Sequence, residues 1–358
     1  MSQRGLRCAH VFSTFGAGGP QIRAVQLMGQ LGALHQHVVM AMDGNTDAKA
    51  QLPAGVVCEW VPPPPKGGFV ATVRAQRRWL AALRPDLVLT YNWGAIETVA
   101  AARWLGVPIV HHEDGFLPDE VQRRLWRRSF LRRCLLRKVP VIVPSLVLQR
   151  IATEEWRLPA ANVKHLPNGV DLVRFRPAAA PAAAIVGMVG GLRPEKDHST
   201  LLRALSQLPG PVRACVVGGG ALAAALHTEA LALGVAGRVQ WVGPVTDTAP
   251  WYTTFSLFVL SSRTEQMPIA MLEAMAAGLP VVATDVGDVR AILPPSAAAC
   301  IVPANDPAAL AAAIGRVLAD HPLAAQLGAD NRARVTERYE AATCLQRFLD
   351  VYAAAIRT

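Results

Sequence analysis

Two glutamates, Glu265 and Glu273, flank a proline and an apolar run, a spacing that could bring two carboxylates to one ligand. Pro268 suits the first position of a helix, because its φ is preset and it needs no hydrogen-bond acceptor. The apolar run predicts a buried helix over Ile269–Ala277, which Gly278 would end. We therefore expect Glu265 in the loop before this helix and Glu273 between one and two turns inside it.

The start of this predicted helix is a candidate site for an anion. Met267 has no side-chain oxygen to cap the backbone amides of Ile269 and Ala270, and uncapped amides at a helix start bind phosphate. Because carboxylates accept hydroxyl groups, carboxylates beside such amides suit a nucleotide sugar. Taken alone, two glutamates at this spacing are more often solvated side chains.

A glycine-rich loop follows the first predicted strand. Gly16, Gly18 and Gly19 would let the backbone approach a phosphate, and Pro20 marks another helix start without a side-chain cap. The loop is not the G-x-G-x-x-G of dinucleotide-binding enzymes, since Gln21 occupies the third glycine position. A plain turn, or a nucleotide site of another kind, is an equally good interpretation.

Charged and imidazole side chains follow two other predicted strands. Arg193 and Lys196 come after a strand of the second half, where cations could neutralise a diphosphate leaving group. Solvated loop cations are the plainer alternative. His111 and His112 end a strand of the first half, and strand alternation lets only one of them face a given side. A histidine in such a place is more often structural than catalytic.

Short buried strands alternate with helices along the chain, which indicates parallel βαβ units and an α/β fold. The strands predicted in the first half are Arg7–Phe12, Val38–Met42, Val56–Trp60, Leu87–Thr90, Ile109–His112, Val141–Val143 and Val163–Leu166. Those predicted in the second half are Ile185–Val189, Arg213–Val217, Val239–Trp241, Leu257–Leu260, Val281–Ala283 and Cys300–Val302. We expect two doubly wound Rossmann-like domains facing a cleft, at 1–176 and 185–340, with a linker between them.

Length and composition exclude several classes of protein. The chain has 358 residues, no apolar run as long as a membrane span of ~18 residues, and no signal-like N-terminus. Its six cysteines are scattered, as in cytosolic proteins with reduced thiols, and no cluster of residues has metal-ligand spacing. We therefore expect a cytoplasmic protein with neither a metal nor a cofactor.

The passage SSRTEQMPIAMLEAMAAGLPVVATDVG, from Ser261 to Gly287, closely resembles the donor-site signature of retaining, GT-B-fold glycosyltransferases of family 4, also called glycosyl transferases group 1. The turn Pro167–Asp171 and the loop Val217–Gly220 resemble two further motifs of that family. The resemblance covers nearly all of the chain. It implies the GT-B fold, and it implies that the last helix, within 341–358, crosses back to the first domain.

The resemblance also implies roles for the candidate residues. Glu265 would face the donor sugar, Glu273 would hold the ribose, and Lys196 would bind the diphosphate. A histidine at position 111 or 112 would contact the donor sugar across the cleft, and the first glycine loop would meet the donor phosphate or the acceptor. The other donor-binding positions are Gly218, Gln266, Met267, Pro268, Ile269 and Ala270.

The sequence departs from the family pattern at two places. The family arginine of the diphosphate loop falls on Gly191, so we expect Arg193, two residues on, to reach the same phosphate. Gln266 stands where the family has a glycine. If that glycine uses a positive φ, glutamine there would be strained by ~1 kcal/mol.

The net charge of +10 is concentrated in one segment, Arg123–Lys138, which holds eight cations, and there is no acid between Glu120 and Glu154. This segment predicts a basic helix in which Trp126 and Phe130 are interleaved. Arginine with such aromatic residues suits an anionic membrane surface, and a solvated helix face is the alternative. We expect no nucleic-acid partner, because no nucleic-acid-binding motif is recognised.

Together these features predict a retaining glycosyltransferase of the hexosyltransferase type, acting in cell-envelope or exopolysaccharide synthesis. The donor would be a UDP-, GDP- or ADP-sugar, and the acceptor a glycan or a lipid-linked molecule. The protein would work in the cytoplasm or on the inner face of the membrane. A sugar-nucleotide epimerase of GT-B fold and a non-catalytic sugar-nucleotide-binding protein are the alternatives.

Overall fold

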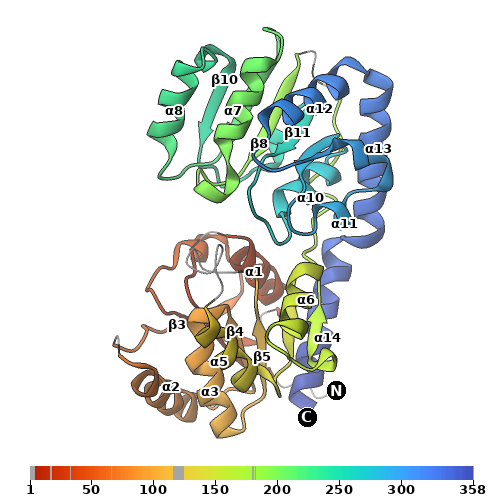
Figure 1. The fold of residues 1–358 in the computed structure, drawn as a ribbon. Coiled ribbons are helices and arrows are strands. Elements are labelled where there is room, and N and C mark those ends of the chain that lie inside the picture. Colours follow the sequence, from red (N-terminus) through yellow and green to blue (C-terminus); the bar gives the residue numbers. More distant parts are fainter. Residues whose placement is uncertain are drawn as a thin grey trace. The chain divides into compact units, whose positions relative to one another are not determined.

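The computed structural model describes residues 5–16, 18–32, 34–65, 67–115, 125–179, 181 and 183–357. The chain divides into two compact units, each built around its own parallel sheet (Figure 1). Unit 1 comprises Met1–Pro167 and Cys344–Thr358, and unit 2 comprises Asn168–Thr343. The last helix, α14 (Ala341–Arg357), therefore belongs mostly to unit 1.

The turn after Pro167 belongs to unit 2, although the sequence placed the first boundary at 176. The Val170 amide donates to the Tyr339 carbonyl oxygen at 2.8 Å, and both Val170 and Phe175 are buried in the unit 2 core. These contacts hold the turn to unit 2 before the linker begins.

The described residues of unit 1 form a seven-stranded sheet in which every pair is parallel, with the order β3-β2-β1-β4-β5-β6-β7. Each strand predicted in this half is present. Their bounds are β1 Arg7–Phe12, β2 Gln36–Ala41, β3 Val57–Trp60, β4 Leu87–Tyr91, β5 Ile109–His112, β6 Val141–Val143 and β7 Val163–His165.

Helices cover both faces of this sheet, as buried parallel strands require. Helix α1 (Gly19–Leu31) and α14 pack with one set of core residues. The other face is covered by α2 (Phe69–Leu83), α3 (Ile96–Leu105), α5 (Trp126–Leu136) and α6 (Leu146–Glu154). Helix α5 is the described part of the predicted basic helix, whose first residues lie outside the described ranges.

The described residues of unit 2 form a six-stranded parallel sheet with the order β10-β9-β8-β11-β12-β13. The strands are β8 Ile185–Val189, β9 Arg213–Val217, β10 Val239–Gly243, β11 Leu257–Leu260, β12 Val281–Thr284 and β13 Ile301–Val302. The helices that concern the site are α7 (His198–Gln207), α9 (Ala249–Tyr252), α10 (Ile269–Ala276) and α13 (His321–Arg338).

Both sheets contain a point at which the strand order reverses. In unit 1 it lies between β1 and β4, and in unit 2 between β8 and β11. The loops that leave two such strands diverge to opposite faces, and ligands of doubly wound sheets bind in the crevice between them. In unit 2 these are the loops after Val189 and after Leu260, which carry most of the predicted donor residues.

Candidate functional site

Lys196 and Glu265, predicted from two separate loops, meet at the point where the unit 2 sheet reverses. The Lys196 Nζ lies 2.5 Å from Glu265 Oε1, with 19% and 10% of the two side chains exposed. Ser262 Oγ donates to the same carboxylate oxygen at 2.7 Å. The pair is neither buried nor fully solvated, so a ligand can reach both charges.

Helix α10 begins beside this pair without a side-chain cap. Pro268 is the residue before the helix, with φ −73°, one position earlier than the sequence predicted. In this part of the described chain no side chain accepts from the first amides of the helix, which start at Ile269 and Ala270. Met267 turns into unit 2, where its sulfur accepts from the Asn168 amide at 3.0 Å. The start of α10 thus lacks a side-chain cap, and anion binding by its first amides stays a prediction.

Gln266 does not carry the strain that its replacement of a family glycine suggested. Its φ is not positive, and its carbonyl oxygen accepts from the Asp288 amide at 3.3 Å. The tight approach is taken instead by Gly287, with φ +53°, where a Cβ atom would lie 2.2 Å from the Glu265 carbonyl oxygen. A neighbouring glycine therefore provides the space that this loop needs.

Glu273 lies on α10 and is half-buried. The Tyr252 hydroxyl donates to its Oε2 at 2.6 Å, and the same hydroxyl contacts the Ala270 carbonyl oxygen at 3.1 Å. Burial raises the pKa of Glu273 to about 7, while the Tyr252 hydrogen bond and the nearby Arg174 act in the opposite direction. This carboxyl group therefore changes its charge near neutral pH. No pattern in the sequence indicated Tyr252, because it lies on α9, before β11 and outside the predicted donor-site segments.

The Arg193 side chain occupies the space beside Gly191, the position at which the family has its arginine. A Cβ atom on Gly191 would lie 3.2 Å from Arg193 Nε, so the Arg193 side chain passes where a residue-191 side chain would emerge. Its Nε is 3.1 Å from Glu195 Oε1, and 61% of the side chain is exposed. Arg193 can thus present its guanidinium at the edge of this loop.

Gly218 lies directly after β9, where the chain comes close to the loop after β8. Its φ is +144°, and a Cβ atom there would lie 2.0 Å from the Gly190 carbonyl oxygen. The loops after β8 and β9 can approach each other only because position 218 has no side chain. The close contact explains why a glycine is needed at position 218, and its predicted place beside the nucleotide stays a prediction.

The glycine loop of unit 1 leads directly into α1. Gly18 precedes the helix with no side-chain cap in the described residues, and Gly19 is its first residue. Gln21 Nε2 donates to the Thr14 carbonyl oxygen at 2.8 Å and ties the helix to the loop. Gly16 hydrogen-bonds within the loop, its amide donating to Thr14 Oγ1 at 3.3 Å. Their contact with a donor or an acceptor stays a prediction.

The two candidate histidines are both completely buried in unit 1. His111 Nδ1 lies 2.8 Å from Thr90 Oγ1, and its Nε2 lies 3.4 Å from Glu113 Oε2. His112 faces the opposite side of the sheet, and its Nε2 lies 2.8 Å from the Tyr352 hydroxyl of α14. Burial holds the pKa of His112 well below its usual value. In this structure both rings serve as interior hydrogen-bonding groups, and contact with a sugar stays a prediction.

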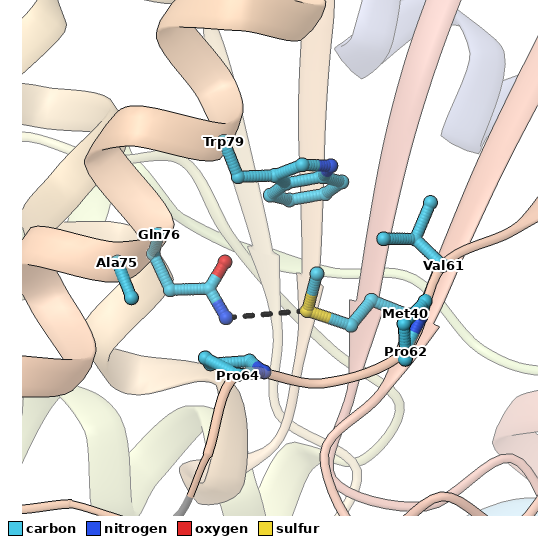
Figure 2. Close-up of a pocket in the computed structure, with 7 residues that line it drawn as sticks. All are labelled: Met40, Val61, Pro62, Pro64, Ala75, Gln76 and Trp79. Carbon is cyan, nitrogen blue, oxygen red and sulfur yellow. Dashed lines mark hydrogen bonds between the residues drawn. The ribbon is translucent and has the colours of Figure 1, made fainter.

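Unit 1 also contains a small apolar cavity of about 160 Å³ between β2 and α2, shown in Figure 2. Gln76 Nε2 donates to the Met40 sulfur at 3.3 Å across it. Its lining residues are Met40, Val61, Pro62, Pro64, Ala75, Gln76 and Trp79. None of these was predicted as a site residue, and the cavity carries no charge.

Within the described ranges, no group of three or more His, Cys, Asp or Glu residues is arranged to hold a metal ion. No described helix is both long enough and apolar enough to cross a membrane.

Both halves of the chain match sequence models of glycosyltransferases. Residues 17–174 match the model described as Glycosyltransferase Family 4, and residues 183–320 match Glycosyl transferases group 1. The chain is 28% identical to a D-inositol 3-phosphate glycosyltransferase of Streptomyces bingchenggensis, over 97% of this chain and 87% of the relative. It is 30% identical to D-inositol 3-phosphate glycosyltransferase 2 of Catenulispora acidiphila, over 88% of this chain and 85% of the relative.

Solved structures share the fold. Anabaena HepE in complex with UDP-glucose superimposes with a TM-score of 0.85 at 19% identity, covering 98% of this chain and all of that one. WaaG, a glycosyltransferase involved in lipopolysaccharide biosynthesis, gives 0.74 at 17% identity, covering 97% and 99%. Two Rossmann-like units of this kind define the GT-B fold, and the matching sequence models define a glycosyltransferase with that fold. More particularly, the chain belongs to glycosyltransferase family 4, the glycosyl transferases group 1.

Proposed function

We propose that this glycosyltransferase is a retaining enzyme that moves a hexose from a nucleotide-diphosphate sugar to a glycan or a lipid-linked acceptor. The observation that carries the donor assignment is the Lys196–Glu265 pair at the reversal of the unit 2 sheet, beside the uncapped start of α10. A cation, a carboxylate and free amides together match the diphosphate and the sugar hydroxyls of such a donor.

In this proposal the donor lies mainly on unit 2. Glu273 accepts the ribose hydroxyls, and Lys196 and Arg193 bind the diphosphate together with the first amides of α10. Glu265 accepts a hydroxyl of the sugar. Because Lys196 already contacts Glu265 at 2.5 Å, a bound diphosphate would compete for the ammonium group and free the carboxylate for the sugar.

The chemistry that these groups support is departure of the nucleoside diphosphate. Lys196, Arg193 and the helix amides stabilise the negative charge that develops on the leaving phosphate. The acceptor would attack from the same face of the sugar, with the leaving phosphate taking its proton, which retains the configuration at the anomeric carbon. No metal ion is needed if these groups neutralise the diphosphate.

Unfolding curves with UDP-, GDP- and ADP-sugars test the donor, since a ligand at 100 times its Kd adds ~2.7 kcal/mol to the free energy of unfolding. NMR of the product then gives the anomeric configuration. An inverted product would overturn the retaining mechanism. Epimerised nucleotide sugar without an acceptor would point to an epimerase, and binding without any turnover to a non-catalytic binding protein.

The names of several relatives support a role in cell-envelope or exopolysaccharide synthesis. One is the lipopolysaccharide core biosynthesis mannosyltransferase LpcC of Rhizobium leguminosarum bv. viciae, which is 31% identical over 50% of this chain and 56% of the relative. We propose an envelope glycan or its lipid-linked precursor as the acceptor. The reaction would then take place in the cytoplasm, at the inner face of the membrane.

We further propose that α5 contacts this membrane, with one correction to the sequence argument. Arg132 is completely buried and paired with Glu113 at 3.1 Å, so it is not part of the basic surface. Trp126 and Phe130 remain 72% and 58% exposed. Arginine with exposed aromatic residues favours an anionic lipid interface.

Co-sedimentation with vesicles of anionic phospholipid tests this contact. Replacing the exposed Arg127, Arg133 and Arg137 with Gln should release the protein, because each Arg near the surface contributes ~1 kcal/mol. The matched control replaces three exposed arginines of unit 2, Arg203, Arg213 and Arg338, and should stay bound. If the wild type does not sediment with anionic vesicles at low salt, the surface of α5 is only a solvated face.

A further inference from the structure

The two loops that carry Lys196 and Glu265 are joined by a second ion pair. Arg263 Nε lies 3.0 Å from Asp197 Oδ2, and its NH2 group donates to Asp197 Oδ1 at 3.1 Å. The guanidinium therefore grips both carboxylate oxygens, the most directional form of this contact. Each partner is adjacent in sequence to a residue of the proposed donor site. Asp197 follows Lys196, and Arg263 follows Ser262, whose hydroxyl donates to Glu265.

Hydrogen bonds to backbone atoms also connect the two loops. The Arg263 amide donates to the Glu195 carbonyl oxygen at 2.8 Å. Ser261 Oγ donates to the Asp197 carbonyl oxygen at 2.9 Å and lies 3.3 Å from that of Lys196. The loop after β11 thus contacts three consecutive residues of the loop after β8, on both sides of Lys196.

Asp197 has a left-handed backbone conformation, and its contacts with the loop after β11 help to hold it there. Its φ is +48°, in the left-handed region, which is unfavourable for a residue other than glycine. Only 4% of the residue is exposed, and Thr200 Oγ1 also donates to its Oδ2 at 2.7 Å. A glycine would adopt this backbone without strain, but it would have no carboxylate for Arg263.

We propose that Arg263 and Asp197 are positioning residues, a clamp that holds the Lys196 ammonium and the Glu265 carboxylate in register for the donor. The clamp rests on the proposed function, because it acts through Lys196. Neither clamp residue needs to touch the donor: the Asp197 carboxylate is occupied by Arg263 and Thr200. A clamp of this kind converts two flexible loops into one prearranged site, which lowers the ordering cost of binding.

Epistasis with Lys196 tests this role. Arg263→Gln should weaken UDP, GDP or ADP binding, and slow transfer, by about tenfold, the size expected for residues coupled in one network. In a Lys196→Ala background the same substitution should change affinity by less than about twofold, because the group that it positions is gone. Arg263→Lys, which keeps the charge without the two-pronged grip, should lie between wild type and Arg263→Gln.

Two further variants separate positioning from simple loosening. Arg203→Gln breaks an ion pair of 3.0 Å with Glu229 elsewhere in unit 2 and should leave affinity unchanged. Asp197→Gly keeps the left-handed backbone, removes the carboxylate, and should reproduce the loss caused by Arg263→Gln. An equal loss of affinity from Arg263→Gln with and without Lys196 would overturn the clamp, as would no loss at all.

Hydrogen exchange decides the same question without a ligand. Arg263→Gln should accelerate exchange of the amides at Lys196 and Arg263, whereas Lys196→Ala should not. Unchanged exchange in Arg263→Gln would overturn the clamp even if nucleotides bind. If wild type bound none of the three nucleoside diphosphates, the proposed function would fail, while the exchange result would still judge the clamp.

Discussion

The two sheets reverse their strand order in the same way, yet they treat charge differently at the loops near the reversal. In unit 2, Lys196 and Glu265 are paired at 2.5 Å but remain partly exposed. In unit 1, Arg23 of α1 pairs with Asp114, directly after β5, at 2.7 Å, with only 4% and 5% of the side chains exposed. The unit 2 pair is therefore partly accessible to solvent, whereas the unit 1 pair is buried.

The aromatic and imidazole groups follow the same division. Tyr252 in unit 2 bonds a carboxyl group whose pKa lies near neutrality, while Tyr352 in unit 1 bonds a histidine held neutral by burial. The same topology therefore carries partly exposed charges at the edge of one sheet and an interior polar network in the other unit. A sheet reversal indicates where a site can form, and the exposure of its charges indicates whether one does.

The largest effect that this comparison predicts is at Lys196. Lys196→Ala should lower kcat/KM with the nucleotide sugar by about 10²-fold or more, as expected for a lost electrostatic stabiliser of the leaving group. Lys164→Ala removes the same charge from an exposed position on β7 of unit 1 and serves as the control. Steady-state kinetics that leave Lys196→Ala within about threefold of wild type would remove Lys196 from the site.

Arg193 should account for the next largest effect. Arg193→Ala should weaken nucleoside diphosphate binding by about tenfold, the loss of one hydrogen bond to a charged group. Adding Gly191→Arg to that variant should restore affinity, because Gly191 has no positive φ and the space beside it is then vacant. Gly191→Ala in the same background is the control and should restore nothing. Wild-type affinity in Arg193→Ala, measured by calorimetry, would contradict the assignment.

Glu273 and Glu265 should differ in their effects on nucleoside diphosphate affinity, on its pH dependence and on the rate of transfer. Burial raises the pKa of Glu273 from its ordinary value of 4.5 to about 7, so the ionised form that accepts ribose hydroxyls grows as pH rises. Affinity for the nucleoside diphosphate should therefore increase about tenfold between about pH 6 and pH 8. Glu273→Gln should weaken binding and abolish this part of the pH dependence.

Glu265→Gln should slow transfer more than it weakens diphosphate binding. Equal losses of diphosphate affinity in the two variants would refute this division of roles.

The same shift has a consequence for the free energy of unfolding. The folded state retains the Glu273 proton at pH values where the unfolded chain has lost it, so its contribution to stability falls as pH rises from 4.5 through about 7. Glu273→Gln should remove this decline. Denaturant unfolding at several pH values measures it, and parallel curves for the two proteins would contradict the raised pKa.

The smallest predicted effect compares two tyrosines. Tyr352→Phe removes the hydroxyl that bonds His112 and should cost ~1 kcal/mol of unfolding free energy while leaving nucleotide affinity unchanged. Tyr252→Phe removes a similar hydrogen bond in unit 2 and should also alter nucleotide affinity, because Glu273 loses its donor. Weaker nucleotide binding in Tyr352→Phe would break the division between the two units.

Much of the fold was predictable because buried parallel strands are short runs of β-branched residues between turns. Strands β1, β5, β6, β8, β9 and β11 begin and end where the sequence predicted. The family resemblance implied that Lys196 and Glu265 share one site, and the topology explains their meeting, since loops after neighbouring strands lie at one edge of the sheet. Sequence could not give the partners that arrive from distant elements, such as Tyr252 for Glu273, Arg263 for Asp197 and Tyr352 for His112.

The number of cations in the basic helix does not tell which of them are exposed. Arg132 lies among exposed cations in sequence, yet it is stacked between Trp93 and Trp156, at 4.8 and 4.7 Å from the two ring centres. Its burial depends on its ion pair with Glu113, which lies directly after β5, and net charge does not reveal this partner. The face of a helix, and not its composition, decides which cations a membrane can meet.

The position of α14 has a consequence for synthesis on the ribosome. Phe348 and Tyr352 complete the unit 1 core on the α1 face, but they are translated only after all of unit 2. Unit 2 is continuous in sequence and can close its core first, so the half that is made first is finished last. Until α14 emerges, unit 1 presents an open apolar face beside α1.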